Sequence, residues 1–165
     1  MKANGVDAYR GFAAGGLSAL WGAALLPYAE DDFDGWPIGV ADLAPYYPRA
    51  LALTGLAAEH DALTSRYPLY AEPTARLNTS SQARVIAERM AANAPALSAQ
   101  QILFGGARLA ITAGEGGAGG CVHCGMCLYG CPYGLIYSAA TTLRTLSTAR
   151  GFTYAPGLIV RRVEE

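Results

Sequence analysis

Charged side chains are scarce in this sequence. They make up 15% of its 165 residues, and the net charge is −1. The chain therefore has no basic stripe for a nucleic acid and no acidic tail. Histidine occurs only twice. We expect His60 to be a solvated residue at a helix end and His123, between two cysteines, to be exposed. Neither is placed as a general base.

Long uninterrupted apolar segments are also missing, although the hydrophobic fraction of 52% is ample for one domain with a core. Residues 11–29, preceded by Lys2 and Arg10, imitate an export signal, but Asp7 and the glycines within the stretch weaken that interpretation. No other segment is long and apolar enough to span a bilayer. Because clustered thiols are typical of a reducing compartment, we expect a cytoplasmic protein. Export, with residues 1–29 as a signal-like segment, is the alternative.

Cysteine is confined to one run, in which all four cysteines follow the pattern C-x2-C-x2-C-x3-C-P. Bacterial ferredoxins use this spacing to bind an iron–sulfur cluster. Two-residue gaps let the backbone wrap one face of a cubane, and Gly125 and Gly130 permit the tight, left-handed turns that wrapping requires. The run therefore predicts electron transfer. The candidate metal ligands are Cys121, Cys124, Cys127 and Cys131.

The fourth cysteine leaves the kind of site open. In two-cluster ferredoxins it serves the other cluster, while the first cluster takes a remote cysteine, which this sequence lacks. Either Cys131 completes one site, or a ligand lies outside these residues, or no cluster is held. Zinc is a weaker alternative, because structural zinc sites usually pair two C-x2-C knuckles across a longer spacer. Disulfides are weaker still, and free structural thiols are a further alternative.

Caps and periodicity predict several short elements. The expected elements are a helix over 42–53, an irregular loop over 63–77, a helix capped by Ser80 or Ser81, a strand and turn over 103–113 with Leu109 and Ile111 alternating, a helix from Ser138 or Thr141 to a stop at Gly151, and two short strands around Pro156-Gly157. Pro48 is expected to kink the first helix. In the second helix, Val85, Ile86 and Met90 form an apolar stripe that we expect in the core.

Residues 114–119 match the dinucleotide fingerprint G-x-G-x-x-G. The fingerprint requires a helix that opens from its last glycine and holds the pyrophosphate at its N-terminus. Here the cysteine run follows at once, and no acidic residue lies about twenty positions further on. We interpret this motif as a loop.

Three stretches, together with the cysteine run, resemble the FAD-dependent glucose–methanol–choline oxidoreductase family. The family's G-G-[ST]-S-x-x-N-G loop, which passes the flavin diphosphate and ring, is similar to residues 14–22, AGGLSALWG. Its W-P-[IL]-x-x-x-x-L-x-P-Y-Y segment, which enters the substrate domain, is similar to residues 35–47. The strand that meets the adenine of FAD resembles residues 157–160. The cysteine pattern occurs in a bacterial branch of the family, where some relatives carry an iron–sulfur cluster.

The resemblance implies a mixed α/β (α+β) fold, with a partial FAD-binding domain and the start of a substrate or cap domain. The implied segments are 1–34 and 137–165 for the FAD-binding domain, 35–113 for the cap region and 114–136 for the cysteine-rich loop. The implied cofactor is FAD, with a 4Fe-4S cluster in addition. The residues expected to hold FAD are Gly15, Gly16, Ser18, Trp21, Gly22 and Val160.

The implied reaction is oxidation of the CH–OH group of an alcohol or sugar, with hydride transfer to flavin N5. A cluster would then pass electrons singly to an external acceptor, which favours a dehydrogenase over an oxygen-using oxidase. The implied partners are thus a small alcohol or sugar and an electron acceptor.

The sequence departs from the family at several places. Trp21 stands where most members have asparagine, as on the pyranose-oxidase side of the family, and Leu20 excludes a covalent flavin link at the preceding position. The family's N-terminal strand–glycine-loop–helix does not precede Met1, and its catalytic histidine would lie beyond Glu165. We therefore expect an internal fragment without catalytic residues, inactive when isolated. The alternatives are a ferredoxin-like 4Fe-4S or metal-binding module without flavin, and a structural remnant.

Overall fold

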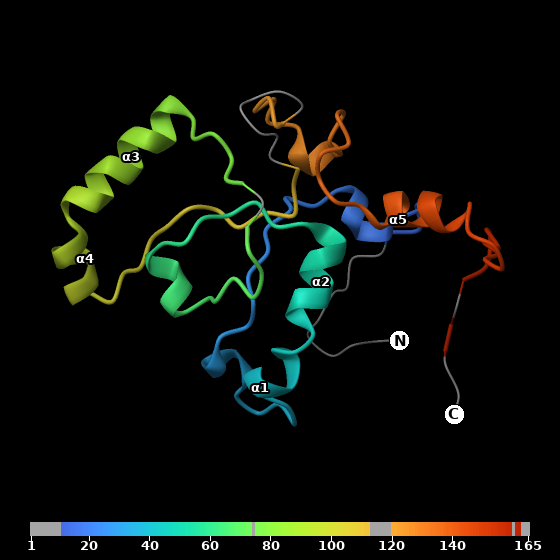
Figure 1. Cartoon of the computed structure of the whole chain (residues 1–165), viewed down its shortest axis with the longest axis horizontal. Helices are drawn as coiled ribbons and strands as arrows, with labels where there is room; N and C mark the ends of the chain where they lie inside the picture. The colour runs from blue at the N-terminus through green and yellow to red at the C-terminus, as the bar shows by residue number, and fades with distance from the viewer. Residues whose placement is uncertain (1–10, 74, 113–119, 160, 163–165) are drawn as a thin grey trace. The chain divides into compact units, whose positions relative to one another are not determined.

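Short helices joined by long irregular segments make up the computed structural model of this protein (Figure 1). The structure describes residues 11–73, 75–112, 120–159 and 161–162. The helical elements there are η1 (Gly16–Ala19), η2 (Glu30–Phe33), α1 (Val40–Leu43), α2 (Tyr47–Thr54), η3 (Ala62–Ser65), α3 (Ser81–Ala92), α4 (Ala94–Ala99), η5 (Cys127–Tyr129) and α5 (Ala139–Leu146), where η denotes a 3-10 helix. Within these ranges β-structure is limited to isolated bridges. The fold is mostly helical and at most mixed.

The chain divides into two compact units. One combines residues 1–19 with 138–165, and the other comprises residues 20–137. The division into an FAD-binding domain, a cap region and a cysteine-rich loop stays a prediction. In the part of the chain that the structure describes, every helix is too short or too polar to cross a bilayer.

The first unit is organised by η1 and α5. Ser138 caps α5, as predicted, because its Oγ accepts a hydrogen bond from the Ala140 N–H at 3.3 Å. Ser18 Oγ in η1 accepts another from the Ala139 N–H at 2.8 Å. The helix ends at Leu146, before the predicted stop at Gly151, and turns follow. The strands predicted around Pro156-Gly157 do not form among the described residues, where the tail is exposed and makes no β-bridge.

The core of the second unit surrounds an extended segment, residues 108–112. Leu109 forms bridges to both Ala24 and Ala57, and Ile111 forms a bridge to Ile136. The strand predicted over 103–113 is therefore present only in its second half and only as bridges. The predicted alternation is wrong, because consecutive residues Ala110 and Ile111 are 0% and 6% exposed. Residues 108–112 form backbone hydrogen bonds along both edges of the segment. An alternating pattern requires one face of a strand to be open to solvent, and a segment in this central position has no such face.

The helix predicted over 42–53 is two helices. The α1 helix ends at Leu43, and α2 begins at Tyr47 with Pro48 in its first turn. Proline has no N–H to donate to the preceding turn and is tolerated only at the start of a helix. Pro48 therefore interrupts the helix rather than kinking it.

The α3 helix begins as predicted, with Ser80 Oγ accepting a hydrogen bond from the Ala83 N–H at 3.2 Å. Its apolar stripe is not in the core. Val85 and Ile86 are 44% and 52% exposed, and Met90 is half-buried. The α3 helix contacts the short helix α4, which is too small to cover the stripe.

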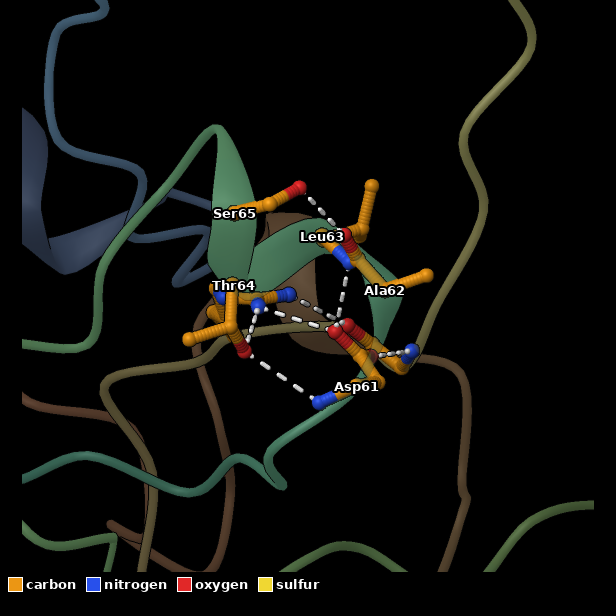
Figure 2. A network of polar contacts seen from close by, with 7 residues as sticks. Asp61, Ala62, Leu63, Thr64 and Ser65 are labelled. Carbon is orange, nitrogen blue, oxygen red and sulfur yellow. Dashed lines mark hydrogen bonds and ion pairs between the residues drawn. The ribbon is translucent and has the colours of Figure 1, made fainter. Parts of the chain in front are cut away.

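A buried ion pair joins η3 to the extended segment. Asp61 caps η3: its Oδ1 accepts a hydrogen bond from the Leu63 N–H at 3.0 Å, and its own N–H donates to Thr64 Oγ1 at 3.2 Å (Figure 2). Arg108, which is 4% exposed, donates from Nη2 to the same Asp61 Oδ1 at 3.0 Å. The Gly106 N–H donates to Asp61 Oδ2 at 2.7 Å. This pair was not foreseen from the sequence.

One hydrogen-bond donor of this network is unsatisfied among the described residues. The Nε of Arg108 is buried and has no hydrogen-bond partner among the described residues. The other guanidinium nitrogens donate to Asp61, to Gly106 O at 3.3 Å and to Thr64 Oγ1 at 3.4 Å. A buried N–H without an acceptor costs about 1–3 kcal/mol, so this one requires an explanation.

Candidate metal centre

The cysteine run forms a loop around η5. Gly125 and Gly130 have φ values of +73° and +90°, which confirms the left-handed turns predicted for them. His123 also adopts a positive φ, +54°. These reversals keep the loop tight, because each turns the backbone in a direction that ordinary helix or strand geometry does not allow.

All four cysteines line one cavity of about 210 Å³. Cys121, Cys127 and Cys131 are half-buried against the core, and Cys124 is exposed. All four are free thiols, so the structure gives no support to disulfides. The remaining walls come partly from the cysteine run and the residues directly after it, namely Val122, His123, Gly125, Tyr133, Leu135 and Ile136, and partly from more distant positions of the second unit, namely Gly22, Ala23, Leu77, Leu109 and Ile111.

The Cys131 thiol has the most distinctive surroundings of the four. Burial raises its pKa, but hydrogen bonds from the backbone amides of Leu135, Tyr133, Ile136 and Gly134 outweigh that effect and lower the pKa below its usual value. Amide donors stabilise the thiolate, which is the form that binds metals. These amide donors were not predicted from the sequence. The turn-forming Pro132 and Gly134 directly after the cysteine were their only signal.

Both histidine side chains are exposed, as predicted, although His60 lies in an irregular segment rather than at a helix end. The His123 side chain is exposed, while its backbone N–H donates to Cys121 Sγ at 3.4 Å. The main chain rather than the imidazole thus contacts sulfur. His60 is exposed, with its Nε2 at 4.0 Å from Glu72 Oε2.

The donor set of this cavity is four thiols. In the described ranges, no three His, Cys, Asp or Glu side chains are arranged to bind one metal ion. Tetrahedral zinc, with Zn–S bonds of about 2.3 Å, would require sulfurs within about 4 Å of one another. A cubane is larger and takes its thiolates from around its own volume. Amides that donate to sulfur are a known means of tuning such clusters.

Three of the residues expected to hold FAD belong to the first unit. Gly15 has φ +90°, and a Cβ at this position would lie 2.8 Å from Ala140 N, so only glycine fits. Gly16 also has a positive φ, +56°. Ser18 Oγ donates to Gly15 O at 2.5 Å and accepts from the Ala139 N–H. The contacts of this loop support the start of α5.

Trp21 and Gly22 belong to the second unit. Trp21 Nε1 donates to Tyr137 O at 2.8 Å, and the indole packs against the same core as three of the cysteines. Gly22 lines the cysteine cavity. Val160, predicted to hold adenine, and the motif at 114–119 lie outside the described residues.

Comparison with protein-family models, with curated proteins and with solved structures finds no match for this chain.

Proposed function

We propose that this chain is a segment of an FAD-dependent oxidoreductase acting on the CH–OH group of an alcohol or sugar, and that its cysteine loop holds an iron–sulfur cluster. The observation that carries the proposal is the convergence of all four cysteines on one cavity. The ferredoxin spacing of the same cysteines supports the cluster over other metals.

The chain's own residues fit a cluster in three ways. Cys121, Cys124, Cys127 and Cys131 supply the thiolates. The amides after Cys131 lower the pKa of its thiol and so favour the thiolate form. Apolar walls, including Leu109 and Ile111, limit water around the cavity, which influences the reduction potential of a bound group. When bound, the cluster supplies one-electron transfer.

The flavin part of the proposal is supported by two residues at the same core. Trp21 and Gly22 belong to the stretch that resembles the flavin loop. Trp21 packs against the core that also carries three cysteines, and Gly22 lines the cysteine cavity. A flavin held next to Trp21 would thus lie near the cysteines and could be reoxidised one electron at a time.

A ferredoxin-like module without flavin is the second candidate. It is favoured by the fact that every residue lining the cysteine cavity lies within residues 20–137, which form one compact unit. Such a module would need no other part of an enzyme to hold its cluster.

Anaerobic purification tests the cluster. We expect a brown protein with broad visible absorption and about four iron and four sulfide ions per chain. Cys127→Ser should lose this absorption. Met126→Ser is the matched control, because Met126 lies in the same loop and does not line the cavity, and it should retain the absorption. A colourless, iron-free protein purified without air would refute the cluster.

The same preparation separates the two candidates. The protein encoded by the complete open reading frame should contain FAD. Addition of an alcohol or sugar should bleach the flavin absorption, and the signal of the reduced cluster should then appear in the electron paramagnetic resonance spectrum. A protein that assembles the cluster but never retains FAD would establish the flavin-free module.

A further inference from the structure

Trp21 is bonded to the stretch of chain that follows the cysteine loop. Its indole Nε1–H donates to the Tyr137 carbonyl oxygen at 2.8 Å, across 116 positions of the sequence. The indole is half-buried and packs against the core of the 20–137 unit. A hydrogen bond from such a ring fixes the ring and the carbonyl relative to each other, because breaking it leaves the indole N–H unpaired and partly shielded from water.

The chain at residues 135–137 forms part of the wall of the cysteine cavity through its first two residues. The Leu135 carbonyl oxygen accepts a hydrogen bond from the Thr112 N–H at 2.9 Å. The Tyr137 N–H donates to the Ala110 carbonyl oxygen, also at 2.9 Å. Together with the bond from the indole, these two contacts anchor the wall to the core.

Cys131 is the ligand that this wall serves. Its side chain packs against the same core as the indole, and the backbone amides of residues 133–136 donate hydrogen bonds to its sulfur. The same residues thus act as cavity wall and as donors to sulfur. Hydrogen bonds to a ligating sulfur raise the reduction potential of an iron–sulfur cluster, because they stabilise the negative charge that reduction adds. The position of this wall therefore influences the potential.

We propose that Trp21 is a positioning residue for the cysteine site: its indole N–H holds the Tyr137 carbonyl, and with it the amides that face Cys131 Sγ, and so sets the reduction potential of a bound cluster. The inference rests on the iron–sulfur part of the proposed function and does not require the flavin. Trp21 itself does not line the cysteine cavity. It acts through the main chain after Cys131, as residues behind a metal ligand commonly do.

Trp21→Phe removes the indole N–H and tests its effect on the potential. The 165-residue chain is purified anaerobically, and its cluster is titrated with a reductant while the electron paramagnetic resonance signal is recorded. We expect the equilibrium constant for one-electron reduction to fall about threefold to tenfold, the effect of one weakened hydrogen bond. A tenfold fall lowers the potential by about 59 mV.

The matched control is Trp36→Phe. Trp36 is 59% exposed, its ring contacts are with Tyr28 and Phe33, and it does not line the cysteine cavity. The same change of side chain at this position should leave the potential of the cluster as it is in the unaltered chain.

Amide hydrogen exchange in the metal-free chain tests the positioning without a cluster. In Trp21→Phe, the amides of residues 133–137 should exchange about threefold to tenfold faster than in the unaltered chain. The amides of α3, which belongs to the same unit, should exchange at unchanged rates. Faster exchange in both segments would indicate general destabilisation and would count against a specific role for the indole.

A measurement on the unaltered chain covers the case in which Trp21→Phe does not fold. If the indole bond favours the reduced cluster, reduction must strengthen that bond by the same factor, because linkage is reciprocal. We therefore expect the Trp21 indole N–H to exchange about threefold to tenfold more slowly in the reduced state than in the oxidised state, and the Trp36 indole N–H to exchange equally fast in both.

The possible failures can be told apart. A cluster whose potential is the same in Trp21→Phe and in the unaltered chain would make Trp21 a purely structural residue and overturn the inference. Equal indole exchange in the two redox states would do the same. Unchanged amide exchange at residues 133–137 would show that the indole does not hold the wall. An unaltered chain without any cluster would instead refute the proposed function, and the inference with it.

Discussion

The Asp61–Arg108 network and the cysteine loop are two polar regions of the same unit with opposite organisation. The Asp61 carboxylate accepts hydrogen bonds from Leu63, Gly106 and Arg108. Its charge is neutralised by a side chain with almost no exposure. This region requires only one further acceptor, for Arg108 Nε.

The cysteine loop shows the contrary pattern. Its sulfurs receive backbone hydrogen bonds at Cys131 and Cys121, and a cavity lies between them. Around it, Leu128 and Tyr129 are 66% and 82% exposed. A polar region that satisfies itself contributes to stability, whereas four thiols around a cavity offer bonding capacity to a ligand. The difference marks the first region as structural and agrees with the ligand-binding role proposed above for the second.

Removing Asp61 should have the largest effect on stability. Asp61→Ala leaves the Arg108 charge buried and unpaired, and we expect the free energy of unfolding to fall by about 3–5 kcal/mol in urea denaturation. Asp31→Ala is the control, because Asp31 pairs with Arg66 at 2.7 Å in an exposed position and should change stability little. Similar effects of the two substitutions would remove the distinction between a buried and a surface pair.

A smaller effect is expected in the cysteine loop. Gly125 has φ +73° and open space around it, so Gly125→Ala meets only backbone strain. That strain costs about 1–2 kcal/mol and should weaken cluster retention against an iron chelator about fivefold to thirtyfold. Gly125→Asn is the matched control, since asparagine adopts this conformation more readily. Equal retention by the Ala and Asn variants would show that the left-handed turn does not matter.

The smallest expected effect is the change in stability with pH that the Cys131 thiol causes. Because the folded pKa of Cys131 lies below its ordinary value, its thiolate contributes stability that is fully present above the ordinary thiol pKa and is lost as the pH falls through the lowered one. In the metal-free protein, alkylation of Cys131 should therefore begin at lower pH than in urea. Mass spectrometry of the modified peptide measures both profiles, and coincident profiles would refute the effect of the amide donors.

The predictions from the sequence that the structure confirms are those of helix caps and turns, which depend on residues close together in the chain. Caps at Ser80 and Ser138, and the turns at Gly125 and Gly130, require only local backbone preferences. The Asp61–Arg108 pair joins residues 47 positions apart, and periodicity says nothing of such contacts. The pattern from Asp61 to Thr64 does resemble a helix N-terminus, so the cap was readable although its arginine partner was not.

The candidate site was predicted in composition but not in surroundings. The spacing of the cysteines marked them as a group, whereas the walls contributed by Leu77 and Leu109 depend on tertiary packing. The same limit explains α3. Its stripe at Val85 and Ile86 has the period of a buried face, but the neighbouring helix is too short to bury it.

The hydrogen bond from Trp21 to Tyr137 spans 116 positions at 2.8 Å. The polypeptide therefore enters and leaves the 20–137 unit at adjacent points. Segments with neighbouring ends are the ones that tolerate transfer into the surface loop of a host protein. The cysteine-bearing unit, residues 20–137, therefore has the end spacing that insertion into a surface loop of another protein requires.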